Sequence, residues 1–161
     1  MNHEREPATA TSVELARYLG TWYEIARKPL RFEGEDYTDI TATYSLNDDG
    51  TIRVDNRALD GEGEPKQSVG QARVLEGSGN AKLEVSFLPE GLRWIPFTRG
   101  DYWILRVDRE YRTALVGTPD RTNLWLLSRT PQPDSATRAS FLGFAREQGF
   151  DLSDLIEPRH G

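Results

Sequence analysis

Hydrophobic and polar residues alternate with period two along most of this chain, and turn residues interrupt the alternation about every ten positions. One segment, for example, places Ile40, Ala42 and Tyr44 on one face and the intervening threonines on the other. A period of two is the signature of a strand with one buried face, and regularly spaced turns indicate a sandwich or barrel. The pattern therefore predicts an all-β fold.

Eight such segments follow one another, and most are joined by short turns such as Asn47-Asp48-Asp49-Gly50. Consecutive antiparallel strands that close on themselves leave no exposed sheet edge. We therefore expect an eight-stranded antiparallel up-and-down β-barrel, whose interior holds side chains or one small ligand. The predicted strands cover about residues 21–28, 39–46, 51–58, 67–75, 82–87, 101–107, 112–118 and 123–129.

The pattern changes at both ends of the chain. Residues 1–12 are polar and predict a flexible arm, and a short helical turn from Val13 to Tyr18 precedes Gly20. Apolar residues at helical spacing predict an α-helix over about residues 135–148, packed outside the barrel and followed by a short tail. With 161 residues, we expect one domain over 13–161, with its barrel at about 20–130.

We expect Trp22, in the first strand, to meet Arg129, at the end of the last. A guanidinium stacked on an indole gains about 0.5–2 kcal/mol, and its donors can satisfy nearby carbonyls. Gly20 lies where the backbone must turn tightly before this strand. We interpret these residues as structural, closing one end of the barrel.

Alternation also predicts which side chains face the barrel interior, where a lipid-like ligand would be bound. Small residues at Gly70 and Ala72 favour a cavity, although a core filled by aromatic residues is the alternative. Tyr44, Asn56 and Tyr102 are the polar groups expected to orient a carboxylate or phosphate. The expected ligand-binding residues are Ala26, Ile40, Ala42, Tyr44, Val54, Asn56, Val85, Phe87, Tyr102, Ile104, Val116, Trp125 and Leu127.

Two charged residues, Glu24 and Arg106, share this inward parity. Charges inside a barrel are costly unless they are paired. Three interpretations stay open: an ion pair between the two residues, a site on Arg106 for an anionic head group, or a position near the strand ends where both reach water.

The loop after the fifth predicted strand is apolar, with Leu92, Trp94 and Phe97. It is expected at the open end of the barrel. There it would form either a lip for transient contact with a membrane or a partner, or a lid over the cavity.

Composition narrows the chemistry. The chain has no cysteine, its two histidines lie near its ends, and its net charge is −6. These features argue against thiolate catalysis, metal or cofactor chemistry, and nucleic-acid binding. No apolar run reaches the ~20 residues of a membrane-spanning helix. The first residues lack the apolar core of a signal peptide, so a cytoplasmic location is expected, with the periplasm or outer membrane as the alternative if a leader was removed.

Three motifs resemble the signatures of the lipocalin family, and the resemblance covers about residues 13–157. Gly20-Thr21-Trp22-Tyr23-Glu24-Ile25-Ala26-Arg27 is similar to the first, Val107-Asp108 with Tyr111 to the second, and Ser128-Arg129 to the third. The match is nearest to the bacterial lipocalins, with apolipoprotein D and the temperature-induced lipocalins as kin. The resemblance places Asp108 and Tyr111 at the closed end with Trp22.

The resemblance implies a protein that stores or transports small hydrophobic ligands, with fatty acids or lysophospholipids implied for the bacterial group. We expect a monomer or weak homodimer. An enzyme acting on a lipid-like substrate is one alternative, with a carboxylate such as Glu24 as general base. A module that binds no ligand and uses the outer face formed by Trp103, Leu105 and Val107 is the other. We expect the C-terminal helix to cover that face, and we expect no enzyme activity.

Overall fold

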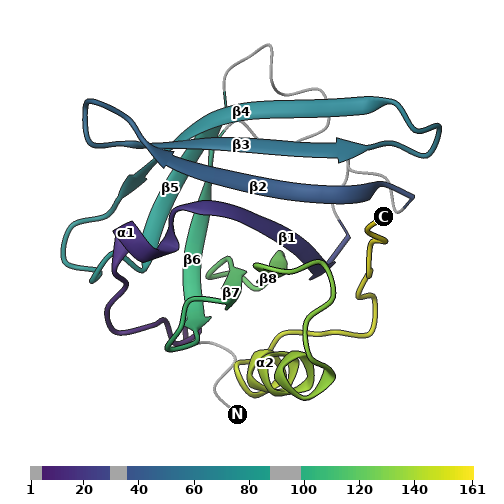
Figure 1. Cartoon of the computed structure of the whole chain (residues 1–161). Coiled ribbons are helices and arrows are strands. Elements are labelled where there is room, and N and C mark those ends of the chain that lie inside the picture. Colours follow the sequence, from purple (N-terminus) through teal and green to yellow (C-terminus); the bar gives the residue numbers. More distant parts are fainter. Residues whose placement is uncertain (1–4, 30–35, 88–98) are drawn as a thin grey trace.

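The computed structural model describes residues 5–29, 36–87 and 99–161. Its strands are β1 (Gly20–Arg27), β2 (Thr38–Leu46), β3 (Ile52–Leu59), β4 (Pro65–Val74), β5 (Lys82–Phe87), β6 (Arg99–Val107), β7 (Thr113–Gly117) and β8 (Leu124–Ser128). They form a closed barrel in chain order, and every neighbouring pair is antiparallel (Figure 1). This confirms the predicted eight-stranded up-and-down barrel.

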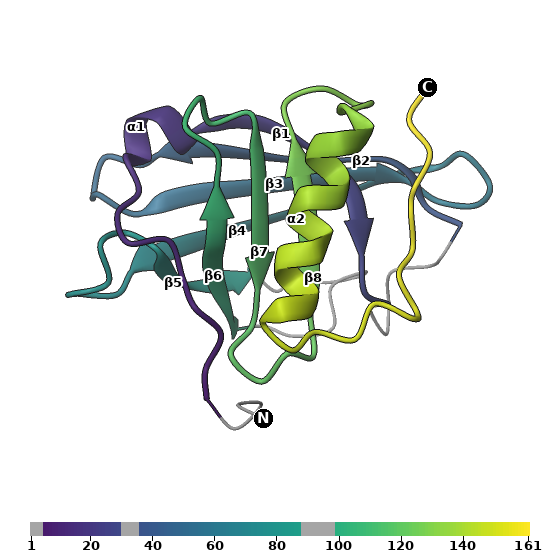
Figure 2. The same ribbon diagram turned by 90° about the horizontal axis from the view of Figure 1, so that it is seen from below.

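Two helices accompany the barrel. The short α1 (Leu15–Tyr18) precedes β1, and α2 (Ser135–Glu147) follows β8. The carboxylate of Asp134 accepts a hydrogen bond from the backbone N–H of Thr137 at 3.1 Å, which caps the start of α2. Figure 2 shows α2 lying along the outside of the barrel beside β7 and β8. Neither helix in the described part of the chain has the length and apolar character that crossing a membrane requires.

Apolar side chains separate into two main clusters, one on each side of the barrel wall. The inner cluster contains Trp22, Tyr44 and Ile104. The outer cluster joins Trp103 and Leu105 on β6 to Phe141 and Leu142 on α2 and to Phe150 after it. The helix thus covers the outer apolar face, as expected from the sequence.

A bulge in β1 corrects the predicted direction of Ala26. Against β8, Glu24 pairs with Leu127 but Ala26 pairs with Leu126, so the register shifts by one residue. Because side chains alternate across a strand, this shift turns Ala26 outward, where it joins the outer cluster. The same shift turns Arg27, opposite Trp125, toward the interior.

A second bulge, in β6, corrects two more predictions. The register against β7 shifts between Ile104 and Arg106, so Arg106 pairs with Leu115 of the outer cluster. The Arg106 guanidinium lies 4.9 Å from the ring centre of Phe141, outside the barrel. Val107, predicted on the outer face, packs against the inner cluster instead. Strict period-two alternation is therefore wrong at both positions.

The segments before and after the barrel also contact it. Within residues 5–12, the backbone N–H of Ala10 donates to the carbonyl of Ile104 at 3.0 Å. The C-terminal tail forms a β-bridge between Ile156 and Arg27, and the N–H of Asp39 donates to the carbonyl of Arg159 at 2.8 Å. The tail thus lies between β1 and β2 beyond the point where their direct pairing ends, at Tyr23 opposite Thr41.

Candidate functional site: a closed barrel end, an apolar cavity and a buried ion pair

Arg129 closes the barrel at the end where β1 begins. Its guanidinium carbon lies 3.8 Å from the centre of the Trp22 ring, so the predicted stack is present. Its N–H groups donate to five backbone carbonyls, and the acceptors belong to Arg17, Tyr18, Leu19, Thr21 and Tyr111. One cation therefore holds together the helix α1, the start of β1 and the turn between β6 and β7.

The residues around this stack favour the same closure. Gly20 adopts φ +105°, a conformation that residues with a side chain rarely adopt, and an added Cβ would lie 3.2 Å from Nη1 of Arg129. The Trp22 indole N–H donates to the carbonyl of Tyr18 at 2.8 Å. Asp108 accepts from the N–H groups of Arg112 and Thr113 at 2.6 and 2.8 Å, which forms the β6–β7 turn. The Tyr111 hydroxyl accepts from the N–H of Glu14 at 2.9 Å.

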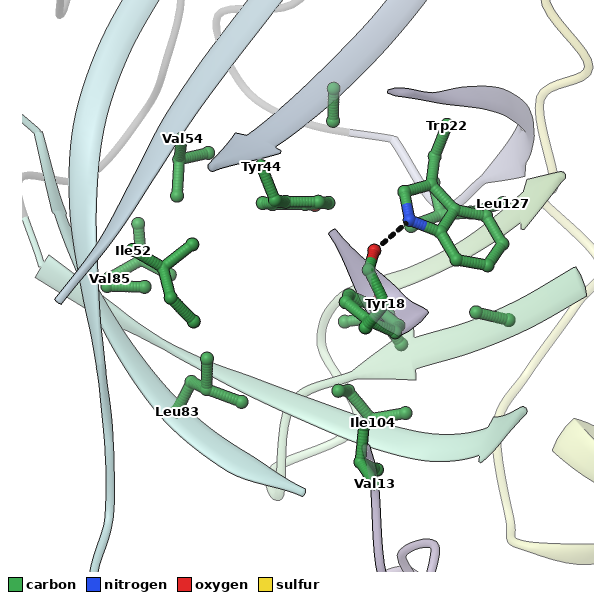
Figure 3. Packing of buried hydrophobic residues seen from close by; sticks show 14 of the residues in the cluster. Val13, Tyr18, Trp22, Tyr44, Ile52, Val54, Leu83, Val85, Ile104 and Leu127 are labelled. Carbon is green, nitrogen blue, oxygen red and sulfur yellow. Dashed lines mark hydrogen bonds between the residues drawn. The ribbon is translucent and has the colours of Figure 1, made fainter. Parts of the chain in front are cut away.

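Above this closed end lies a small apolar cavity of about 10 Å³, which has room for about one water-sized sphere. Figure 3 shows Tyr44, Ile52, Val54, Leu83 and Val85 arranged around it, with Tyr18 and Trp22 to one side. Tyr18 at the end of α1, Leu19 after it and Tyr44 on β2 line the cavity on one side. The other lining residues come from β3 to β6 and are Ile52, Val54, Ala72, Leu83, Val85 and Tyr102.

Three tyrosine hydroxyls form a chain across the cavity wall. The hydroxyls of Tyr18 and Tyr102 lie 2.6 Å apart, and Tyr102 donates to the hydroxyl of Tyr44 at 2.8 Å. Burial raises the pKa of all three above that of an exposed tyrosine, so they are neutral at physiological pH. Two predicted polar groups, Tyr44 and Tyr102, are thus brought together, and Tyr18 joins them.

The predicted ligand-binding residues differ in where they lie relative to the inner cluster. Ile40 packs with Ala58 and Tyr37 in a small separate cluster, and partly exposed Asn56 lies opposite Ala42 and Ser68 in the sheet register. Tyr102 and Trp125 pack against the inner cluster from its margin. The other predicted residues that belong to the inner cluster itself are Ala42, Tyr44, Val54, Val85, Ile104, Val116 and Leu127.

Part of the prediction lies outside the described residues. This holds for the whole loop with Leu92, Trp94 and Phe97, and for the side chain of Phe87. The sequence prediction also missed four lining residues. Ile52 and Leu83 alternate with Val54 and Val85, a signal that was available, whereas Tyr18 and Leu19 precede the strands and carry no alternation.

A buried ion pair lies on the inner side of β1. Nη1 of Arg27 is 3.0 Å from Oε2 of Glu24, and the side chains are 0% and 7% exposed. Burial raises the pKa of Glu24 to about 7, and the adjacent Arg27 opposes that rise. The first two interpretations offered for Glu24 and Arg106 are therefore wrong, because Glu24 is buried with Arg27 and Arg106 lies outside the barrel. The third, that both residues reach water near the strand ends, is wrong for Glu24 but holds for Arg106, which is partly exposed near the end of β6.

The residue missed here, Arg27, lies three positions after Glu24. A uniform strand would place these two side chains on opposite faces. The bulge between Glu24 and Ala26 brings them to the same face.

Comparisons with known proteins agree with this architecture. Residues 13–160 match the model of the lipocalin-like domain. Temperature-induced lipocalin-1 of Arabidopsis thaliana is 40% identical, over 96% of this chain and 83% of that protein. Outer membrane lipoprotein Blc of Escherichia coli K12 is 42% identical, over 94% and 82%. Apolipoprotein D of Mus musculus is 30% identical, over 92% and 78%.

Solved structures share the fold at lower sequence identity. The cockroach allergen Per a 4 superposes with a TM-score of 0.71 at 19% identity, covering 96% of this chain and 92% of that one. Insecticyanin of Manduca sexta reaches 0.72 at 17% identity, covering 97% and 85%. These two structures are similar in fold alone.

Proposed function

Because the chain belongs to the lipocalin family, whose members bind small hydrophobic ligands, we propose that it stores or transports fatty acids or lysophospholipids in its barrel. The apolar cavity above the Arg129 closure carries this proposal. Burial of an acyl chain there contributes about 25 cal/mol per Å² of apolar surface, before the costs of association. Movement of the lining side chains would enlarge a cavity that is nearly filled without ligand.

Binding without chemistry is the proposed mode of action. Glu24, the buried carboxylate on the inner side of β1, is held by Arg27 rather than aimed at an open substrate position. A general base must reach the proton it abstracts. The expected contacts of Ala42, Val54, Asn56, Val85, Ile104 and Leu127 with a ligand stay predictions, as does the role of the loop with Leu92, Trp94 and Phe97 as a lip or lid.

Native mass spectrometry of protein purified without delipidation tests the proposal. We expect co-purified acyl ligands, or uptake of an added fatty acid or lysophospholipid with one ligand per barrel. Val54→Trp is a matched test of location, because it fills the cavity from β3. Val69→Trp is the control, because Val69 lies on the paired strand β4, between the inward-facing Ser68 and Gly70, and its side chain points away from the cavity. A clean mass with no uptake of either lipid would refute the proposal.

We also propose a cell-envelope location in place of the cytoplasmic one expected from the sequence. Its support is the similarity to proteins named outer membrane lipoprotein Blc in Escherichia coli and Citrobacter freundii. Fractionation of cells that express the natural gene tests it. Recovery with the membrane or periplasm is expected, and recovery with cytoplasmic markers would exclude it.

A further inference from the structure

Ser68, on β4, carries a buried hydroxyl that the fold does not use. The residue is 0% exposed, and its Oγ has no hydrogen-bond partner in the described part of the chain. An unpaired buried hydroxyl costs folding free energy, which an alanine at the same position would avoid. Gly70 and Ala72 occupy the next positions on the same face of β4, so this face accepts residues without a polar side chain. The hydroxyl therefore needs an explanation other than stability.

The register of the sheet directs this hydroxyl into the barrel. Ser68, Gly70 and Ala72 are the buried positions of an alternating pattern along β4, and Ala72 lines the apolar cavity. β3 and β4 pair without a register shift, so the alternation holds along the whole pair. Because β1 leaves the closed end and β4 runs antiparallel to β3 and back toward that end, Ser68 lies about 13 Å along the strand from Ala72, away from the closure.

Asn56 lies directly opposite Ser68 on β3 and shares its face of the sheet. Val54 and Ala58, the adjacent positions on that face, are buried, whereas the Asn56 side chain is partly exposed. Its amide has no hydrogen-bond partner among the residues that the structure describes. Directly opposed residues of an antiparallel pair have Cβ atoms about 4.5–5.5 Å apart. An amide N–H of Asn56 and the hydroxyl of Ser68 can therefore donate to the same oxygen atom.

The chemistry of this pair favours an uncharged oxygen. Toward the closed end, the neighbouring inward positions on the two strands are Val54 and Gly70. In the other direction they are Ala58 and Lys66, and the Lys66 Nζ lies 3.7 Å from a carboxylate oxygen of Asp60. A carboxylate or phosphate at the pair itself would lose its water without gaining a counter-charge there. An ester carbonyl is neutral, and its oxygen has two lone pairs, one for each donor.

We propose that Asn56 and Ser68 form a subsite for the acyl ester of the ligand, in which the Asn56 amide and the Ser68 hydroxyl both donate to the ester carbonyl oxygen. The inference rests on the proposed lipid-binding function and deepens it, because it selects an acyl ester such as a lysophospholipid over a free fatty acid. The acyl chain extends past Val54 and Gly70 toward the closed end, and the head group lies on the side of Lys66.

The test compares two lysophosphatidylcholines of the same chain length, one with its chain attached by an ester and the other by an ether, which lacks the carbonyl. Isothermal titration calorimetry below the critical micelle concentration measures both affinities, and the fatty acid of the same length is titrated in parallel. Two neutral hydrogen bonds predict that the wild type binds the ester roughly 10-fold more tightly than the ether.

Variants of the pair assign this preference to its residues. Ser68→Ala should reduce the preference for the ester to roughly 3-fold and leave affinity for the ether unchanged. Since the hydroxyl has no partner, its melting temperature should not fall below that of the wild type. Ser68→Ala/Asn56→Leu should bind ester and ether equally. The control Ser86→Ala removes an exposed hydroxyl from the outward face of β5 and should keep the full preference.

The outcomes separate this inference from the function on which it rests. If the wild type binds ester and ether equally, or if folded Ser68→Ala keeps the full preference, the pair does not bind the carbonyl and the inference is overturned. A lower melting temperature of Ser68→Ala with an unchanged preference would assign the hydroxyl to a buried water alone. Binding of the fatty acid without either lysolipid overturns the inference and leaves the proposed function standing. If none of the three lipids binds, the proposed function fails and the inference falls with it.

Discussion

Replacing Arg129 with methionine should lower the free energy of unfolding by about 4 kcal/mol while leaving the barrel fold intact. Three of its five hydrogen bonds go to part-buried carbonyls, those of Tyr18, Leu19 and Tyr111. Each of these three hydrogen bonds contributes about 1 kcal/mol, and the stack on Trp22 contributes about 1 kcal/mol more. The two exposed carbonyls regain water and contribute little. Methionine keeps most of the apolar contact with the indole ring.

Urea denaturation followed by tryptophan fluorescence and by circular dichroism measures this change. The slope of the unfolding free energy against urea concentration should be unchanged, and the urea concentration at the midpoint of unfolding should fall. The melting temperature should be lower by roughly 10 °C for a chain of this size. Arg112→Met is the matched control, because the Arg112 side chain is exposed on the neighbouring turn. It should stay within about 0.5 kcal/mol of the wild type. Equal stability of the two variants would refute the claim that Arg129 holds the closed end together.

Four further changes test other parts of the structure. Gly20→Ala should cost about 1–3 kcal/mol in thermal unfolding, because it forces a side chain into φ +105°. Tyr102→Phe should cost about 1–3 kcal/mol in urea, since it removes the central hydroxyl of the tyrosine chain. Phe141→Ala should cost about 3–5 kcal/mol through the outer cluster yet leave ligand affinity unchanged. Wild-type stability relative to Glu24→Gln should fall by about 3 kcal/mol between about pH 5 and about pH 8.

The sign of the last prediction follows from proton binding. Glu24 has a pKa of about 7 in the folded protein and 4.5 as its ordinary value. Between these values the folded state holds the extra proton, so raising the pH removes stability. A stability difference that stays constant or grows with pH would show that the carboxyl is not buried as described. Loss of ligand binding in Phe141→Ala would likewise contradict the separation of the inner and outer clusters.

Much of this architecture could be predicted from local patterns. Alternation between turns predicted eight strands, and the spacing of apolar residues predicted α2 and the outer face that it covers. The contact between Trp22 and Arg129 was also predictable, since both residues lie in recognisable motifs at the two ends of the barrel sequence. The strands and the helix depend on residue types repeated at a fixed spacing, and the closed end depends on short motifs, and a linear chain displays both directly.

Local patterns did not predict which charged side chains face the barrel interior. Strand parity placed Ala26 and Arg106 inside the barrel and left Arg27 out, because one inserted residue reverses the direction of every side chain that follows until the strand ends. A bulge is set by pairing with a second strand, β8 for β1 and β7 for β6, so nothing in β1 or β6 alone reveals it.

The sequence by itself thus determined the class of fold and the covering helix, because period-two and period-3.6 patterns record which face of each element is buried. Its motifs also indicated the closed end. Tertiary structure decided what the barrel presents to a ligand. Closure of the strands sets where the register shifts, and those shifts brought Glu24 and Arg27 together. Packing of α1 under the strands then joined Tyr18 to Tyr102 and Tyr44. The tyrosine contacts link segments far apart in the chain, and only the closed barrel defines the distances between them.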